Sequence, residues 1–217
     1  MIIEIYGHPF SSYSWKALIP FYACDIPFEF RMLDQDHAEN GAFIEAAHPA
    51  GKFPVLRESD TMIVEATAII EYLVATQEAA RGLIPADPRE AVVVRMLDRI
   101  FDNYVMGSMQ RIVSAHIADG KNPDLGEIAA GEIGLRRVYA WLEDWLSKNA
   151  LPPHISLVSC AAAPSLFYAD WVERIPDACG RVASLRADLL AHPAVARCVE
   201  EARPYRGLFP SGAPERD

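Results

Sequence analysis

The 217-residue chain has no excess of basic residues. Its 20 lysines and arginines stand against 30 aspartates and glutamates, which gives a formal net charge of −10. Nucleic-acid binding is driven by clustered Lys and Arg side chains that neutralise phosphates. The composition therefore argues against a nucleic-acid partner, and equally against binding to an anionic membrane surface.

Cysteine is also scarce. The four cysteines, Cys24, Cys160, Cys179 and Cys198, are widely spaced and form no Cys-x-x-Cys pair. Structural zinc sites and dithiol redox motifs need cysteines at short, regular spacing. We expect no metal site, and we expect the four thiols to be buried and reduced.

Long apolar runs are missing, as are internal repeats and low-complexity tracts. No apolar stretch approaches the roughly 18 residues of a membrane-spanning helix, and the first apolar segment contains Glu4 without a basic leader. We expect a cytosolic protein with no membrane partner. Apolar residues make up 51% of the chain, enough for the cores of one large or two small domains.

The first part of the chain alternates between strand and helix patterns. Short apolar runs at 2–6 and 28–33 indicate strands, and a helical run follows each of them. A hairpin over 58–60 then leads to a helix that begins near Glu65. The order strand, helix, strand, helix, hairpin, helix is that of a thioredoxin-like βαβαββα domain, which we expect to span residues 1–77.

The second part has only helical patterns. Residues 77–88 contain one glycine and two prolines, which cannot continue a helix and indicate a linker. Apolar residues then recur at helical spacing over 89–117 and 125–146, and shorter runs follow to residue 202. We predict an all-helical domain over residues 89–217 that ends in an irregular tail from residue 204. The predicted fold class is thus α/β followed by all-α.

A candidate binding segment lies in the stretch 51–56. Pro54 precedes two apolar residues at the start of a strand, a position that suits a cis peptide bond and frees the backbone groups of Phe53. The helix that begins at Glu65 adds unpaired N–H groups and a positive dipole end. Together they predict a site for an extended peptide that carries a carboxylate, although a Pro-Val-Leu segment alone also fits a simple strand start.

A candidate catalytic hydroxyl lies at the start of the first helix. Ser11 follows the turn at residues 7–10 and precedes the helical run, so its hydroxyl lies near the positive end of that helix. A thiolate held there gains a hydrogen bond and a favourable dipole, and lowering a thiol pKa from about 8.5 to about 6.5 corresponds to roughly 2.7 kcal/mol. The alternative is an ordinary N-cap serine without a catalytic role.

These features together resemble the glutathione transferase superfamily over nearly the whole chain. The segment Ser11-Ser12-Tyr13-Ser14-Trp15 after a strand that ends in Tyr6 resembles the serine motif of zeta- and theta-type members. The resemblance implies that Ser11 donates a hydrogen bond to the glutathione sulfur. Tyr6 is the competing residue, as in tyrosine-type classes, and Ser12 and Ser14 rank behind both. No cysteine lies between residues 6 and 23, so thiol exchange of the glutaredoxin kind is not expected.

The resemblance also assigns the contacts with glutathione. It implies that Phe53, before Pro54, pairs its backbone with the cysteinyl unit, and that Glu65 and the amide of Ala66 hold the γ-glutamyl end. Lys52, and less surely His37, would meet the glycyl carboxylate, although Lys52 also fits a solvated strand end. Family members usually have serine where this chain has Ala66. Losing that hydroxyl predicts binding weaker by roughly 1.5–3 kcal/mol, unless Thr67 or water compensates.

The second substrate is specified less closely. The resemblance places it near the first helix of the helical domain, where Phe10, Tyr104, Ser108 and Arg111 are candidates. We expect core packing for Tyr104 and a surface salt bridge for Arg111, with contact to the second substrate as the alternative for each.

The function implied is a cytosolic, homodimeric glutathione transferase that activates the thiol for conjugation to a small electrophile, with a role in detoxification and with no metal. The alternatives are a glutathione-dependent cis–trans isomerase of an unsaturated dicarboxylic acid, which a basic pocket beyond Lys52 would favour, and a non-catalytic binding protein.

Overall fold

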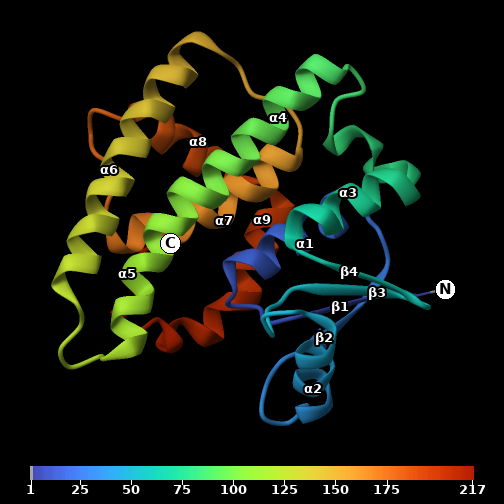
Figure 1. Ribbon diagram of the computed structural model, residues 1–217. Coiled ribbons are helices and arrows are strands. Elements are labelled where there is room, and N and C mark those ends of the chain that lie inside the picture. The colour runs from blue at the N-terminus through green and yellow to red at the C-terminus, as the bar shows by residue number, and fades with distance from the viewer. Residues whose placement is uncertain (1) are drawn as a thin grey trace.

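The computed structural model describes residues 2–217, and its first part contains a four-stranded mixed sheet (Figure 1). The strands are β1 (Ile3–Gly7), β2 (Phe28–Met32), β3 (Val55–Glu58) and β4 (Thr61–Val64), in the order β2-β1-β3-β4. Strand β1 is parallel to β2 and antiparallel to β3, and β3 and β4 form an antiparallel hairpin.

Both faces of the sheet are covered by helices. Side chains alternate along each strand, so Ile5 and Leu56 pack in the core with α1 (Ser12–Ala23) and α3 (Ala66–Thr76). Tyr6 and Val55 point to the other face and pack against α2 (Ala38–Ala47). Figure 1 shows α1 and α3 on one side of the sheet and α2 on the other. The predicted thioredoxin-like βαβαββα order is confirmed.

The second part of the chain is helical, as predicted. Its longest continuous helical run, over residues 88–118, contains a π-helical segment, η2, between two α-helices. The helices are η1 (Glu78–Leu83), α4 (Pro88–Ile100), η2 (Phe101–Met106), α5 (Gly107–Ala118), α6 (Leu125–Lys148), α7 (Leu157–Val172), α8 (Gly180–Ala191), α9 (Pro193–Ala202) and η3 (Arg203–Leu208). No helix within residues 2–217 is both long and apolar enough to cross a membrane.

Short 3₁₀ helices lie in the predicted linker and in the tail that was expected to be irregular. The linker holds η1, whose Ala80 and Leu83 are buried. The tail holds η3, and after it Phe209 is buried edge-on against Phe10 and Trp171. The tail is therefore more regular over 203–208 than predicted, because apolar contacts of Phe209 with distant residues anchor it and local sequence does not reveal those contacts.

The two parts share one core. Helix α1 packs against α3 on one side and against α7 and α9 on the other. Trp15 is fully buried at this junction, with its ring 4.8 Å from that of Phe167 and 5.3 Å from that of Tyr168. The start of α1 is thereby held rigidly between the sheet and the helical part. Of the four thiols, all free, three are buried as predicted, and Cys24 is only half-buried.

Candidate functional site

A first cleft of about 200 Å³, here called the polar cleft, opens where the cis-proline segment and the start of α3 face η2. It brings together five of the residues singled out from the sequence: Lys52, Phe53, Pro54, Glu65 and Ala66. The remaining wall consists of Tyr13, His48, Arg99, Asp102 and Asn103.

The Phe53–Pro54 peptide bond is cis, as predicted. Among residues 2–217, the backbone N–H and C=O of Phe53 have no hydrogen-bond partner. A free donor and acceptor on one exposed residue can pair with an extended peptide as an added strand does. This wall of the polar cleft is therefore suited to a short peptide.

The start of α3 lies beside the cis-proline segment and lines the same cleft. Glu65 has φ +72°, a left-handed conformation that costs a non-glycine residue on the order of 1–3 kcal/mol. No side chain caps the first turn of α3, whereas Asp87 caps α4 by accepting from the N–H groups of Arg89 and Glu90. The free amides of α3 thus lie next to a Glu65 side chain that is 75% exposed, with His48 Nε2 3.6 Å from its Oε1.

Four charged residues form a network beneath the polar cleft. Lys16 on α1 is only 1% exposed, and its Nζ lies 2.6 Å from Asp102 Oδ2. The same atom is 2.6 Å from Asp98 Oδ1, an ion pair whose angle does not suit a hydrogen bond. Arg99 Nη2 donates to Asp102 Oδ2 at 2.7 Å. Burial raises the pKa of Asp102, and the nearby Lys16 charge opposes that rise.

A second cleft of about 260 Å³, here called the apolar cleft, contains Ser11. Ser11 is the N-cap of α1, and its Oγ accepts from the Ser14 N–H at 3.3 Å. Capping uses only the oxygen as acceptor, so the hydroxyl proton remains available to a ligand. The other lining residues are Phe10, Ser12, Tyr13, Met109, Gln110, Val113, Ile117, Tyr168, Leu208, Phe209 and Pro210.

The competing hydroxyls differ in position. Tyr6 is buried, its ring stacks on Phe43 at 4.1 Å, and it lines neither cleft. Ser14 is fully buried, and its Oγ accepts from the His8 N–H at 3.2 Å. Ser12 lines the apolar cleft but is buried.

Sequence reasoning missed Tyr13, which lines both clefts and so joins them. Burial raises the pKa of its hydroxyl to about 12, with the Asp102 charge as the next cause. It also missed Arg99, Asp102 and Asn103. Their spacing of three and four residues places them on one helix face, but no local pattern shows that this face meets the start of α3.

The residues proposed to contact the second substrate do not lie in one cleft. Phe10 lines the apolar cleft, whereas Tyr104 and Ser108 lie in a different groove with Trp141. Arg111 forms an exposed salt bridge with Glu127. The packing expected of Tyr104 was wrong, because its side chain is 59% exposed. The π-helical turn of η2 changes the angular spacing of residues, so extrapolating a 3.6-residue period misplaces it.

His37, the weaker candidate for the glycyl carboxylate, does not line the polar cleft. Its Nδ1 lies 2.6 Å from Asp34 Oδ1 on the surface. This contact raises the pKa of His37, since it favours the charged imidazolium.

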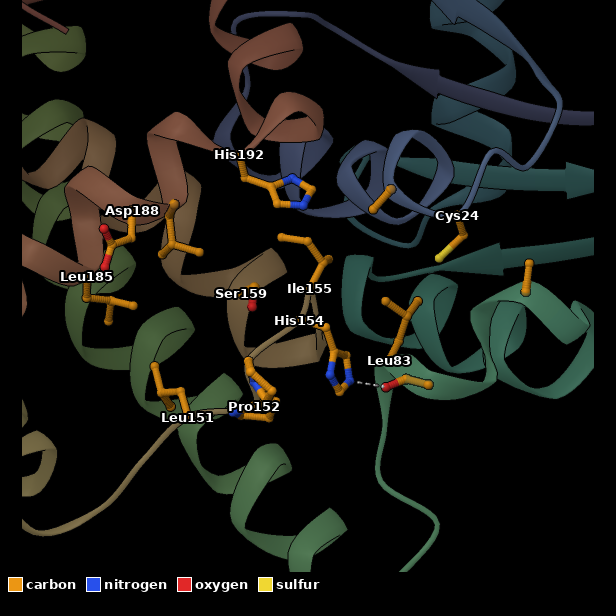
Figure 2. Close-up of a pocket in the computed structure, with 15 residues that line it drawn as sticks. Cys24, Leu83, Leu151, Pro152, His154, Ile155, Ser159, Leu185, Asp188 and His192 are labelled. Atoms are coloured by element: carbon orange, nitrogen blue, oxygen red, sulfur yellow. Dashed lines mark hydrogen bonds between the residues drawn. The ribbon is translucent and has the colours of Figure 1, made fainter.

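Another cavity, of about 660 Å³, lies at the far end of α1 from Ser11 (Figure 2). Its wall includes Cys24, His154 and His192, and His154 Nε2 is 3.0 Å from the Gly82 carbonyl oxygen. It holds none of the candidate catalytic or glutathione-binding residues. Among residues 2–217, no three His, Cys, Asp or Glu side chains are grouped so as to hold a metal ion.

Comparisons with known proteins agree with this geometry. Residues 5–81 match the family model of the glutathione S-transferase N-terminal domain. A probable maleylacetoacetate isomerase of Caenorhabditis elegans is 22% identical over 169 residues, which are 76% of this chain and 78% of that protein. A glutathione S-transferase-like protein of Aspergillus aculeatus is 30% identical over 128 residues, 56% of this chain and 59% of that protein.

Solved structures share the fold over almost the whole chain. Glutathione transferase F7 from Populus trichocarpa has a TM-score of 0.78 at 22% identity and covers 92% of this chain and 99% of its own. Glutathione transferase URE2P8 from Phanerochaete chrysosporium, solved with oxidized glutathione, has a TM-score of 0.81 at 15% identity, with 94% and 96% coverage.

Proposed function

We propose that the chain, whose residues 5–81 match the family model of the glutathione S-transferase N-terminal domain, is a serine-type member of the glutathione transferase superfamily that activates the thiol of bound glutathione for conjugation to a small electrophile. The observation that carries the proposal is the meeting of two clefts at Tyr13: one holds the five peptide-binding candidates and the other holds Ser11. We place the enzyme in the cytoplasm with a role in detoxification.

The polar cleft fits the peptide part of glutathione. Glutathione has one ammonium group and two carboxylates, and the cleft offers Glu65 and Asp102 as anions and Lys52 and Arg99 as cations. The free backbone groups of Phe53 suit the cysteinyl unit. We assign Glu65 to the ammonium group, the amide of Ala66 to the γ-glutamyl end and Lys52 to the glycyl carboxylate.

Ser11 is the group that we assign to the sulfur. Its Oγ already accepts from Ser14, so the hydroxyl donates outward at the positive end of α1. A hydrogen bond to the thiolate lowers the thiol pKa, and the released proton passes to solvent. The thiolate then forms a carbon–sulfur bond with the electrophile, and with an aryl halide the halide ion departs.

The apolar cleft favours an uncharged second substrate. Its lining contains aromatic and aliphatic side chains and no lysine or arginine. A dicarboxylic acid would lose its hydration there without gaining a cationic partner, which is costly.

The isomerase of an unsaturated dicarboxylic acid remains the second candidate, supported by the similarity to the probable maleylacetoacetate isomerase. The isomerase function would be favoured over conjugation if the protein converted such an acid without consuming glutathione and was inactive on aryl halides.

We further propose that the protein is a homodimer. A groove between η2, α5 and α6 is lined by Tyr104 and Trp141, both exposed aromatic residues. Exposed aromatic side chains are enriched at protein interfaces, and a stable two-fold interface buries more than about 1,200 Å². A strictly monomeric mass at micromolar concentration, measured by analytical ultracentrifugation, would contradict this part of the proposal.

The test is a glutathione titration followed by a pH–rate profile with one aryl halide. Ser11→Ala should leave glutathione affinity within a few-fold, because the polar cleft holds the peptide. The bound thiol pKa should rise toward about 8.5, so that the rate at neutral pH falls roughly 10- to 30-fold and recovers as the pH increases.

Two tyrosine variants serve as controls for Ser11→Ala. Tyr6→Phe should keep the wild-type profile, because Tyr6 lines neither cleft. Tyr13→Phe tests the hydroxyl that lies between the clefts. The serine assignment fails if Ser11→Ala keeps the full rate while either tyrosine variant shows the shifted profile, and a wild type that binds no glutathione at millimolar concentration refutes the proposed function.

A further inference from the structure

We propose that Arg99, in the last turn of α4, binds the α-carboxylate of the γ-glutamyl unit in place of the hydroxyl that Ala66 lacks. The inference rests on the proposed function, since it takes glutathione as the ligand of the polar cleft. Arg99 and Ala66 line the same cleft, although they come from different parts of the fold. A cation beside the free amides at the start of α3 makes a carboxylate site stronger than those amides alone.

One edge of the Arg99 guanidinium is free for a ligand. Its Nε donates to Asp98 Oδ2 at 3.0 Å, and its Nη2 donates to Asp102 Oδ2 at 2.7 Å. Among residues 2–217, Nη1 has no hydrogen-bond partner, and the side chain is 49% exposed. The two N–H groups of Nη1 are therefore donors that only a ligand or solvent can use.

Buried charges hold this guanidinium in place. Asp98, like Lys16, is only 1% exposed, and both aspartates that bind Arg99 also contact Lys16 Nζ. Two cations and two anions balance, so the network has no surplus charge to repel a carboxylate. An arginine already fixed by its counter-ions loses little conformational entropy when it binds a ligand.

Thr67, the neighbouring hydroxyl that could have replaced a serine at position 66, is already engaged. Its Oγ1 donates to Asp98 Oδ2 at 3.1 Å and accepts from Lys16 Nζ at 2.8 Å and from Arg99 Nη2. A hydroxyl has one proton to give, and here Asp98 takes it. Arg99, by contrast, contacts Thr67 next to Ala66 and still has free donors on Nη1.

The γ-glutamyl end matches this arrangement. Its ammonium and carboxylate groups sit on one carbon, and the cleft places the exposed Glu65 carboxylate and the Arg99 guanidinium around the start of α3. Binding through Arg99 means that Ala66 does not weaken glutathione binding, which replaces the expectation drawn from the sequence.

The experiment is a calorimetric titration with two ligands: glutathione, and γ-aminobutyryl-cysteinylglycine, which lacks the α-carboxylate. Arg99→Gln should weaken glutathione binding roughly 10- to 100-fold and change binding of the analogue less than about threefold. Arg95→Gln is the matched control. Arg95 lies one turn earlier on α4, is also 49% exposed, pairs with Glu71 and does not line the cleft. It should change both affinities by less than about twofold.

A rescue variant makes the test independent of folding effects. In the Arg99→Gln background, Ala66→Ser should recover at least about fivefold of the lost glutathione affinity, whereas in the wild type it should add little. Equal weakening of both ligands by Arg99→Gln, or no weakening of either, would overturn the assignment while leaving the proposed function intact. A wild type that binds neither ligand would overturn both.

Discussion

The polar and apolar clefts lie next to each other but are built in different ways. The polar cleft draws half of its lining from 52–54, 65 and 66, a segment of fifteen residues. The apolar cleft combines the start of α1 with α5, α7, the end of η3 and the segment after it, which are up to about two hundred residues apart along the chain. A local segment can bind one constant ligand. A wall assembled from distant segments can change its residues without disturbing that binding segment. The difference fits the proposal of a glutathione site beside a more variable site for a second substrate.

The forces that shape the two clefts also differ. Beneath the polar cleft, Lys16, Asp98, Arg99 and Asp102 form a buried network of ion pairs, which is directional and depends on every member. The apolar cleft rests on aromatic packing, with the Tyr168 and Phe209 rings stacked 6.2 Å apart. Variants can therefore damage one cleft and leave the other intact.

The largest effect should follow from removing Lys16. Lys16→Met leaves two buried aspartates with Arg99 as their only cation, and breaking a buried ion pair on one side costs roughly 3–5 kcal/mol. Unfolding in urea measures the loss. Lys148→Met is the control, because Lys148 forms an exposed pair with Asp144 and such pairs contribute at most about 1 kcal/mol. Equal losses of unfolding free energy in the two variants would show that the buried network contributes no more to stability than an exposed ion pair.

Glu65→Gln should act on the polar cleft alone. It removes a charge-assisted contact to the ammonium group worth roughly 1.5–3 kcal/mol, so the KM for glutathione should rise about 10- to 100-fold with kcat nearly unchanged. Steady-state kinetics with varied glutathione measure this. The exposed Glu78, outside the cleft, provides the control variant Glu78→Gln. Loss of folded protein instead would make Glu65 a structural residue.

Leu208→Ala should act on the apolar cleft alone. Leu208 is exposed and lines that cleft, so truncation removes apolar contact with the electrophile without opening the core. We expect the KM for an aryl halide to rise about five- to tenfold, or roughly 1–1.4 kcal/mol, while glutathione affinity is unchanged. Leu125→Ala removes another exposed leucine, outside both clefts, and should change neither value. A change in glutathione affinity would contradict the separation of the clefts.

The contrast between the clefts explains which structural features could be predicted from the sequence. The strand and helix order, the cis bond before Pro54 and the N-cap at Ser11 follow from local patterns, and the structure confirms them. Five of the six candidate residues share one cleft because the β3–β4 hairpin brings the cis-proline segment next to the start of α3. The roles assigned to these residues remain predictions.

Contacts between distant segments could not be predicted from the sequence. Arg99 contacts Thr67 at the start of α3, and Phe209 packs on Phe10. These contacts join distant segments, so the periodicity of the sequence does not predict them. The exposed Tyr104 was misplaced for a related reason, since a π-helical turn leaves no local signature here. The limits 1–77 and 89–217 stay a prediction, because one continuous core joins the two parts of the chain.

The smallest effect should come from a charge far from both clefts. Glu4 on β1 accepts from Arg57 on β3 and from Arg31 on β2. The hydrogen bond from Arg57 lowers the pKa of Glu4 below its usual 4.5, against the opposing effect of burial. A carboxylate with a lowered folded-state pKa adds stability above its unfolded-state pKa and loses it as the pH falls through the folded-state value. Glu4→Gln should therefore cost up to about 1 kcal/mol near neutral pH, since both arginines are partly exposed.

The pH dependence of this difference distinguishes an ion-pair effect from a packing effect. The gap between wild type and Glu4→Gln in urea unfolding should be constant above about pH 5 and should shrink below about pH 4, as Glu4 becomes protonated. Glutathione affinity should not change, because Glu4 lines neither cleft. A stability difference that persists at about pH 3 would mean that the shape of the Glu4 side chain, not its charge, stabilises the sheet. Altered glutathione binding would show that Glu4 on β1 affects the polar cleft.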